Sequence, residues 1–403
     1  MRTVAALLFL VQSTDFSAEG LKALEERRYD AAVESFQKAI AAEASDYSAH
    51  FNLALAYGFL NKDDEGIAEY RKTLELKPGL EAAEVNQGML LFRQKRPAEA
   101  LALLEDAAQQ KPQDFQARYY LAQCELETGA LAKSAENFRA AIEINSKSAA
   151  AELGLAHALA RQQDLAGAAP HFRQSAQLDA GHRDALLELA DLYEKNKQIP
   201  EALALYHEFP DDAAVQEHAG ELMLRSDQYA AAIPSLEQAY AKGPTEANRI
   251  ALAVAYQFNK QLEKALPLFD KAAADDPSSF DIRMMYARAL RDARQYPAAI
   301  HQFNQAVKIK PGDVRAWSDL ASVLYVNGDL PEALTAFDRA RQLGENTPGN
   351  WFLRAIILDK LKQLKPALEA YRQFLSMSHG ENPDQEFQAR QRARIIQNEL
   401  EKH

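Results

Sequence analysis

Apolar, small and polar residues recur along this chain with a period of about 34 residues, most visibly in residues 47–80, 81–114 and 281–313. Within each period the apolar residues stand three or four apart, which places them on one face of a helix. A turn signal divides each period into two such helical stretches. The pattern therefore predicts antiparallel helix pairs stacked side by side, each pair covering the apolar face of its neighbour.

A large residue in each predicted second helix sets the register of about eleven repeats. A small residue stands four positions before it, so the two helices can approach closely and the large side chain can fill the gap to the next repeat. The small residues are Ala32, Gly66, Ala100, Ser134, Ala168, Ala202, Ala232, Ala265, Ala299, Ala333 and Ala367. The large residues are Phe36, Tyr70, Leu104, Phe138, Phe172, Tyr206, Leu236, Phe269, Phe303, Phe337 and Tyr371.

Prolines and cap residues agree with this register. Pro78, Pro112 and Pro311 follow predicted second helices, where proline ends the hydrogen-bond ladder. Asp114 and Asp313 follow two of these prolines and suit the N-cap of the next helix. The helix ends predicted from the apolar pattern and from the turn residues therefore coincide.

In this register the chain resembles the tetratricopeptide repeat family over about residues 13–380. That family has a small residue at position 8 of each unit. Here position 8 is held by Gly20, Ala54, Gly88, Ala122, Ala156, Ala190, Gly220, Ala253, Ala287, Ala321 and Ala355. The resemblance implies an all-α fold: a right-handed superhelical solenoid of about eleven helix-turn-helix repeats.

Two segments depart from the regular repeat. The sequence Phe209-Pro210-Asp211-Asp212 shortens the unit at residues 183–212, because proline cannot continue a helix. Residues 381–403 have no partner helix and are predicted to form a C-terminal capping helix. We expect that helix to gather its apolar residues on one face: Phe387, Ile395, Ile396 and Leu400.

Residues 1–13 have the layout of a short secretory signal. A positive start at Arg2 is followed by an apolar run from Val4 to Val11 and a small residue at Ser13. The alternative is a leading apolar helix that packs on the first repeat. The run has no polar face, which favours the signal and predicts export to the periplasm or the cell exterior. Without a signal, we expect a cytoplasmic protein.

Composition narrows the partners. Of the 403 residues 47% are hydrophobic, which favours a folded chain over disorder, and the formal net charge is −12. An acidic surface repels phosphate, so we expect neither nucleic acid nor an anionic membrane as partner. The apolar run from Val4 to Val11 is too short to span a bilayer. The single cysteine, Cys124, excludes an intrachain disulfide framework.

Residue patterns that carry chemistry are missing from the sequence. No His-Glu-x-x-His, phosphate-binding glycine loop or nucleophile elbow occurs, so we predict a non-enzymatic protein without cofactor or metal. Cys124 falls at a repeat position that is otherwise apolar, which favours a small buried side chain over a reactive thiol. His157 has no second ligand in register, so a metal role is not expected.

The family resemblance also implies a partner-binding groove, because the first helices of such arrays line a concave surface. The candidate residues are Phe51, Leu55, Phe59, Met89, Phe92, Tyr119, Phe258, Arg288 and Tyr325. Some of these side chains could instead pack within or between units. Phe59 and Phe92 favour the groove, because they end their helices beside the turn. Apolar pockets beside polar groups suit an extended peptide or an amphipathic helix.

One ligand class of the family is not expected. Its dicarboxylate clamp for chaperone tails uses lysine at position 5 and asparagine at position 9, and neither is present here. Position 9 is instead held, in the first units, by Leu55, Met89, Gln123, His157 and Asp191.

These observations predict a scaffold or adaptor of bacterial type that binds a protein or peptide segment in its groove. The alternative is a structural spacer or assembly factor that binds through its outer or lateral faces, and that could associate with itself. The sequence leaves the oligomeric state and the identity of the partner open.

Overall fold

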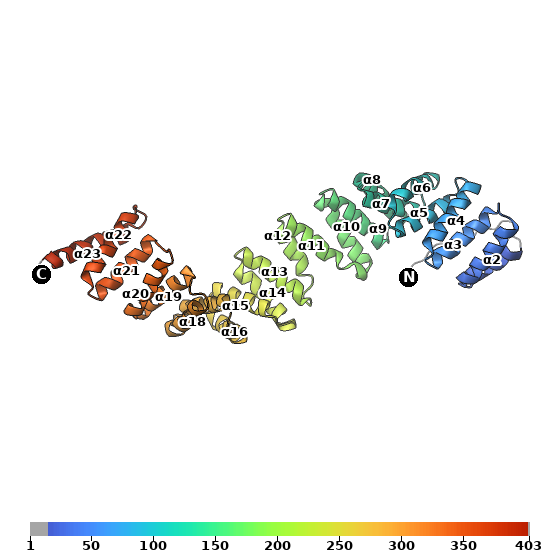
Figure 1. The fold of residues 1–403 in the computed structure, drawn as a ribbon. Coiled ribbons are helices and arrows are strands. Elements are labelled where there is room, and N and C mark those ends of the chain that lie inside the picture. The colour runs from blue at the N-terminus through green and yellow to red at the C-terminus, as the bar shows by residue number, and fades with distance from the viewer. Residues whose placement is uncertain (1–14, 402–403) are drawn as a thin grey trace. The chain divides into compact units, whose positions relative to one another are not determined.

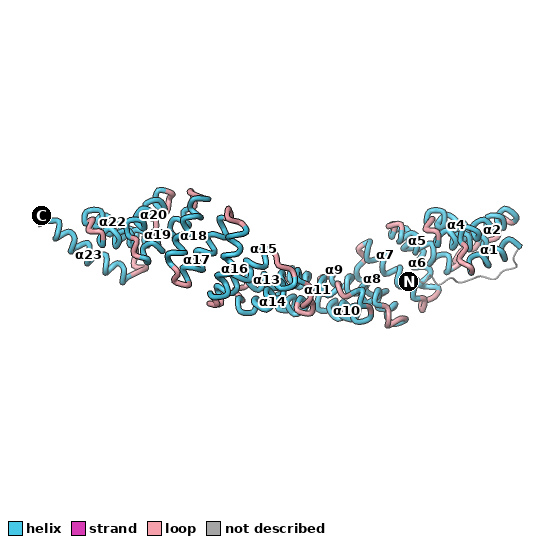
Figure 2. Tube along the Cα trace, turned by 90° about the horizontal axis from the view of Figure 1, so that it is seen from below, coloured by secondary structure: helices cyan, strands magenta, loops and turns pink. Residues whose placement is uncertain are grey.

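The computed structural model describes residues 15–401, and in that range it contains 23 α-helices, one short 3-10 helix and no strand (Figures 1 and 2). Helices α1 to α22 form consecutive antiparallel pairs, which confirms the repeat fold expected from the sequence. The apolar segment from Val4 to Val11, interpreted above as a signal, lies outside the described residues. None of the helices described is long and apolar enough to cross a membrane.

The chain divides into two compact units, Met1–Leu205 and Tyr206–His403. The first unit holds α1 Asp15–Glu25, α2 Tyr29–Ala42, α3 Tyr47–Phe59, α4 Asp63–Leu76, α5 Glu81–Arg93, α6 Pro97–Gln110, α7 Phe115–Thr128, α8 Leu131–Ile144, α9 Ala149–Arg161, α10 Leu165–Leu178, the 3-10 helix Ala180–His182, α11 Ala185–Lys195 and nearly all of α12 Ile199–Tyr206. The second unit holds α13 Ala213–Arg225, α14 Tyr229–Lys242, α15 Glu246–Phe258, α16 Leu262–Asp275, α17 Phe280–Asp292, α18 Tyr296–Ile309, α19 Val314–Asn327, α20 Leu330–Gln342, α21 Pro348–Lys360, α22 Leu364–Met377 and α23 Pro383–Glu401.

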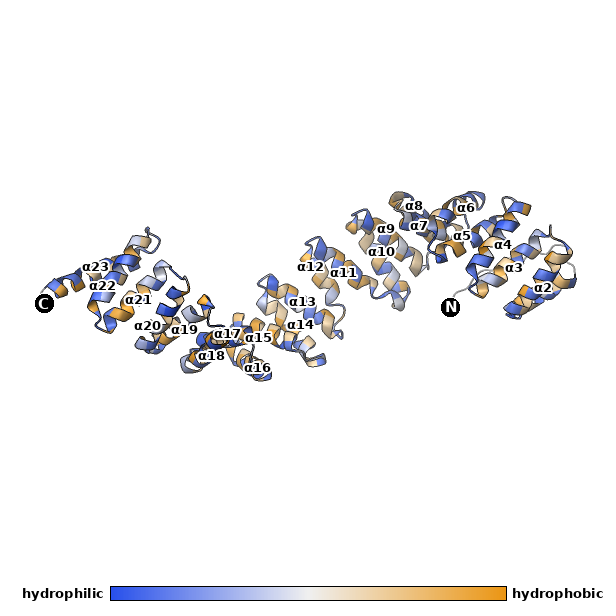
Figure 3. Cartoon of the chain, in the orientation of Figure 1, coloured by the Kyte–Doolittle hydropathy of each residue, from blue (hydrophilic) through white to orange (hydrophobic). Residues whose placement is uncertain are grey.

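Consecutive helices contact each other from α1 to α11 in the first unit and from α13 to α23 in the second. The first helices of neighbouring pairs also touch, as α3, α5 and α7 do, so they line one side of the stack. Hydrophobic and hydrophilic residues alternate along the helices in Figure 3, as expected for elements with one buried face.

The small and large residues of the register pack as the sequence predicts. A methyl group added at Gly88 would lie 2.6 Å from Leu104, and one added at Gly220 would lie 2.4 Å from Leu236. Both distances are too short for a real contact, so the bulky side chain occupies the space that glycine leaves. The rings of Phe138 and Phe303, which stand at the same position of their repeats as Leu104, are fully buried too.

Helix ends follow the cap residues. Asp114 accepts a hydrogen bond from the backbone N–H of Ala117 at 2.8 Å, and Asp313 does the same for Ala316 at 2.9 Å. Gly129 has a left-handed backbone with φ of 85°, which ends α7 at the turn to the next helix. These contacts confirm the predicted caps at α7 and α19.

The irregular segment before α13 contains the shortest second helix. Helix α12 has eight residues, whereas α10 and α14 have 14 each. The buried amide of Gln216 donates to the carbonyls of Tyr206 at 2.9 Å and Phe209 at 3.1 Å. These bonds satisfy backbone acceptors that the early end of a helix would otherwise leave without a partner.

Helix α23 packs on α22 through Ala389 and Ile396, both fully buried. The expectation of a single apolar face on this helix is wrong, because Phe387 is 61% exposed and Ile395 is 42% exposed. Residues 395 and 396 are neighbours in sequence and point about 100° apart on a helix, so they cannot share one narrow face. One side of α23 covers the stack, and the other carries two large apolar side chains.

Candidate ligand-binding groove

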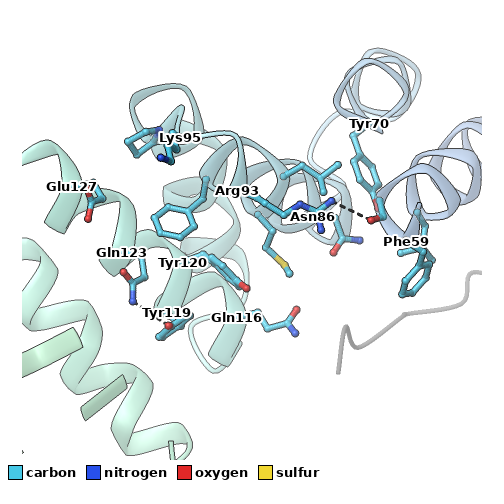
Figure 4. Close-up of a pocket in the computed structure, with 16 residues that line it drawn as sticks. Phe59, Tyr70, Asn86, Arg93, Lys95, Gln116, Tyr119, Tyr120, Gln123 and Glu127 are labelled. Atoms are coloured by element: carbon cyan, nitrogen blue, oxygen red, sulfur yellow. Dashed lines mark hydrogen bonds between the residues drawn. The ribbon is translucent and has the colours of Figure 1, made fainter. Parts of the chain in front are cut away.

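A hollow of about 870 Å³ lies over the first helices α3, α5 and α7 of the first unit (Figure 4). Its lining combines apolar, aromatic, amide and charged side chains. The lining residues are Leu55, Gly58, Phe59, Tyr70, Asn86, Met89, Leu90, Phe92, Arg93, Lys95, Pro97, Gln116, Tyr119, Tyr120, Gln123 and Glu127. We call this hollow the α3–α7 groove.

Five residues proposed from the sequence come together in the α3–α7 groove: Leu55, Phe59, Met89, Phe92 and Tyr119. Phe51 does not join them. It is 1% exposed, and its ring packs edge-on against Tyr70 at 5.5 Å between ring centres. Phe51 faces the second helix of its own pair, so it is a core residue and the interpretation of it as a groove residue is wrong.

Aromatic side chains form the walls of the groove. Phe59 stacks on Tyr29 of α2, with ring centres 4.7 Å apart. Phe92 meets Tyr120 edge-on at 5.9 Å, and Tyr120 meets Tyr119 in the same way at 5.2 Å. Such ring contacts hold the side chains in place beyond their burial. The groove therefore presents a preorganised aromatic surface.

Polar groups line the same surface. The side chain of Asn86 is hydrogen-bonded to the hydroxyl of Tyr70. Gln123 donates from Nε2 to the hydroxyl of Tyr119 at 3.0 Å. Burial raises the pKa of both tyrosines above the ordinary value, so the two hydroxyls stay protonated at neutral pH. The groove offers neutral donors and acceptors of the kind that bind a peptide backbone.

Arg93 belongs to the scaffold of the groove. Its Nε donates to the buried carboxylate of Asp63 at 2.6 Å, and its Nη2 donates to the carbonyl of Gly58 at 3.1 Å. These bonds tie α5 to the end of α3 and the start of α4. Because this guanidinium is engaged, Lys95 and Glu127 are the remaining charged groups of the lining, and they have opposite signs.

The amide side chains of the groove were not predicted from the sequence, although two of them stand at repeat positions that point to the groove. Gln116 and Gln123 stand at repeat positions 2 and 9, which the family resemblance assigns to the groove. Asn86 and Tyr120 stand at position 6, outside that set. An amide that lines a groove cannot be told from any other surface amide by its place in the sequence, so the apolar pattern alone did not predict these residues.

The three remaining candidates lie in the second unit and are engaged in local contacts. Phe258 is 51% exposed and stacks on Tyr229 at 4.7 Å. Arg288 donates to Asp319 at 2.8 Å. The ammonium of Lys360 lies 4.8 Å from the ring centre of Tyr325. None of the three lines the α3–α7 groove.

No other group with unusual reactivity stands out in the described part of the chain. Burial raises the pKa of the Cys124 thiol to about 12, in agreement with its assignment as a packing residue. Nε2 of His157 lies 3.0 Å from Oε2 of Glu188, a contact that lowers the pKa of the carboxyl. Among residues 15–401, no three His, Cys, Asp or Glu side chains are grouped as metal ligands.

A family model described as tetratricopeptide repeat matches residues 17–81, 85–149, 250–314 and 285–350. A second model with the same description matches residues 159–225. Together these matches cover well over half of the chain. The chain belongs to the tetratricopeptide repeat family. Membership of this family supports a role as a protein–protein interaction scaffold.

Individual tetratricopeptide repeat relatives are distant. The general transcriptional corepressor ssn6 of Schizosaccharomyces pombe is 27% identical over 28% of this chain and 11% of its own length. The human protein O-mannosyl-transferase TMTC1 is 26% identical over 49% of this chain and 23% of its own. The chain thus spans less than a quarter of either relative.

Among solved structures, YrrB is described as a tetratricopeptide repeat protein with an unusual peptide-binding site. It is 19% identical, with a TM-score of 0.41, over 42% of this chain and 88% of its own.

Proposed function

We propose that the first unit binds a peptide segment of a protein partner in the α3–α7 groove, and that the protein acts as a non-enzymatic adaptor. The observation that supports this proposal is the combination of a preorganised aromatic wall with neutral amide groups in one hollow of about 870 Å³. That volume is in the range of about 300–1,000 Å³ found for ligand sites.

The lining indicates the kind of segment that fits. Large apolar side chains of the ligand would enter between Phe59, Met89 and Phe92, where burial of each contributes about 1.5–3 kcal/mol. Its backbone N–H and C=O groups would pair with Gln116 and Gln123. Lys95 and Glu127 have opposite charges, so strong selection for a charged ligand is not expected. We therefore propose an apolar, uncharged segment with at least two large side chains.

A matched pair of variants tests this proposal. Gln123 stands at repeat position 9 in the groove, and Ser322 stands at the same position of its repeat in the second unit. Gln123→Arg places a long charged side chain in the groove, whereas Ser322→Arg makes a similar change elsewhere. Peptides selected by display on the purified full chain are then titrated against both variants by fluorescence polarisation.

We expect selected peptides rich in large apolar residues, with an affinity at least about tenfold weaker for Gln123→Arg and unchanged for Ser322→Arg. Equal binding to the parent chain and to Gln123→Arg would show that the ligand lies outside the groove. Circular dichroism and thermal melting of both variants control for loss of fold.

A further inference from the structure

Helix α23 follows α22 in the second unit (Figure 1). Its side away from α22 carries exposed apolar side chains. Six large apolar side chains in the described chain are strongly exposed, and two of them, Phe387 and Ile395, lie on this one helix. The inward side is already occupied, because Ala389 and Ile396 are buried against α22. The two exposed residues are therefore not part of the contact by which α23 caps the stack.

The arrangement of this face is symmetric along the helix. Phe387 and Ile395 stand four residues before and four residues after Gln391, so the three side chains form one ridge. An antiparallel pair of such helices, centred on Gln391, would bring Phe387 of one copy beside Ile395 of the other. The two Gln391 amides would meet at the centre, where each can donate to and accept from the other.

Charge on the face is self-complementary as well. Arg390 is engaged by Glu386 at 2.6 Å, and Arg392 by Asp359 at 2.7 Å, both within the same unit. The exposed side then carries Asp384 near its start and Arg394 beyond its centre, which have opposite signs. Antiparallel pairing brings Asp384 of one copy within about one helical turn of Arg394 of the other.

We propose that the outward face of α23 binds a second copy of this chain in an antiparallel pair related by a two-fold axis at Gln391. The net charge of −12 opposes approach of two copies elsewhere, whereas this face is close to neutral. A shallow hollow of about 460 Å³ beside Phe387, also lined by Phe352 and Ile356, extends the apolar surface. The site is distinct from the α3–α7 groove and does not depend on ligand binding there.

The size of the contact determines its strength. Helix α23 has 19 residues and is about 28 Å long, so a single helix pair buries less surface than a permanent dimer requires. The pair is therefore a reversible dimer that forms with rising concentration. A two-fold contact of this kind closes on itself and stops at two copies.

A disulfide at the symmetry axis tests the geometry directly. The native thiol of Cys124 is buried, so Gln391→Cys introduces one accessible thiol per chain. Across the proposed axis the two new cysteines face each other, and we expect a covalent dimer under mild oxidation that reducing agent reverses. Glu399→Cys is the matched control on the same helix, because its two copies would lie about 24 Å apart along the pair. Equal cross-linking at both positions, or none at Gln391→Cys, overturns the proposal.

Sedimentation velocity of the full chain over a range of concentrations gives the second test. We expect the parent chain to shift from monomer to dimer, and Phe387→Ser with Ile395→Ser to weaken association at least about tenfold. Both residues are exposed, so helix content and melting temperature should stay unchanged. A parent chain that stays monomeric throughout, or a dimer that persists in the double variant, contradicts a contact at α23.

Discussion

The two units contain the same helix pairs and the same stacked aromatic contact, but the side chains around that contact differ. Tyr29 stacks on Phe59 in the first unit, and Tyr229 stacks on Phe258 in the second, both at 4.7 Å and at the same repeat positions. Around Phe59 the chain places apolar and amide side chains that line a hollow. Phe258, in contrast, is 51% exposed.

Repeat position 9 shows the same difference. In the three repeats that form the α3–α7 groove it is held by Leu55, Met89 and Gln123. In two neighbouring repeats of the second unit it is held by Arg288, which pairs with Asp319, and by Ser322. The repeat thus fixes where a side chain lies, and the residue type at each position decides what the surface can bind. Binding chemistry can change from unit to unit while the packing between helices is conserved.

The largest expected effect comes from removing a central ring. Phe138→Ala in the first unit and Phe303→Ala in the second each remove a fully buried side chain, and each should destabilise its unit by about 3–5 kcal/mol. Since each repeat contacts only its neighbours, the effect should stay local. Hydrogen exchange should increase in α7 to α9 for the first variant and in α17 to α19 for the second. Only Phe138→Ala should weaken peptide binding, and a loss of binding in Phe303→Ala would contradict the assignment to the first unit.

Removing the stacked tyrosine from each unit should have a smaller effect on stability, and it compares the two units at equivalent positions. Tyr29→Ala and Tyr229→Ala should destabilise their units by similar amounts, about 1 kcal/mol from the ring contact. Tyr29→Ala should also weaken binding in the α3–α7 groove several-fold, because Phe59 loses its support. Tyr229→Ala should leave binding unchanged. Thermal melting and peptide titration of the two variants separate these effects, and equal loss of affinity in both would argue against the groove.

The smallest effect is a pH dependence of opposite sign in the two units. Burial raises the pKa of Glu125 in the first unit. The unfolded chain therefore loses this proton at a lower pH than the folded chain does, and the folded state is destabilised as pH rises between these two pKa values. Glu125→Gln should therefore be more stable than the parent at pH 7, and the gain should vanish in acid.

Glu386 in the second unit is the matched opposite case. Hydrogen bonds from the Ser378 hydroxyl and the Gly380 N–H lower its pKa, so its stabilising contribution is present at neutral pH and is lost as pH falls through the folded pKa. Glu386→Gln should be less stable than the parent at pH 7, and the two should converge in acid. Chemical denaturation at neutral pH and at a series of acid pH values, extended below the pKa of folded Glu386, checks both signs.

The sequence predicted the helix pairs well because packing at the small and large positions leaves little freedom. The repeat positions of Gly88 and Leu104, for example, are enough to predict their close contact. Groove residues were predicted less completely. Position 5 was assigned to the groove at Phe51, but a side chain at that position can turn toward the second helix of its own pair.

Which side of α23 packs on α22 could not be predicted from the sequence. Helix α23 has no partner helix in the repeat pattern, so apolar periodicity alone does not tell which side packs inward. Ile396 lies two turns after Ala389 on the same side of the helix, and both are buried. Ile395 lies on the adjacent side and is exposed. The exposure of Phe387 depends on how α23 rotates about its own axis against α22, and its sequence position does not fix that rotation.

The burial of Cys124 makes the protein suitable for site-specific fluorescent labelling. It is the single thiol in the chain and is fully buried, so maleimide dyes should leave the native protein unlabelled. Any surface residue replaced by cysteine then becomes a unique attachment point without prior engineering. A dye attached in this way beside the α3–α7 groove would report the binding of a peptide through its change in fluorescence.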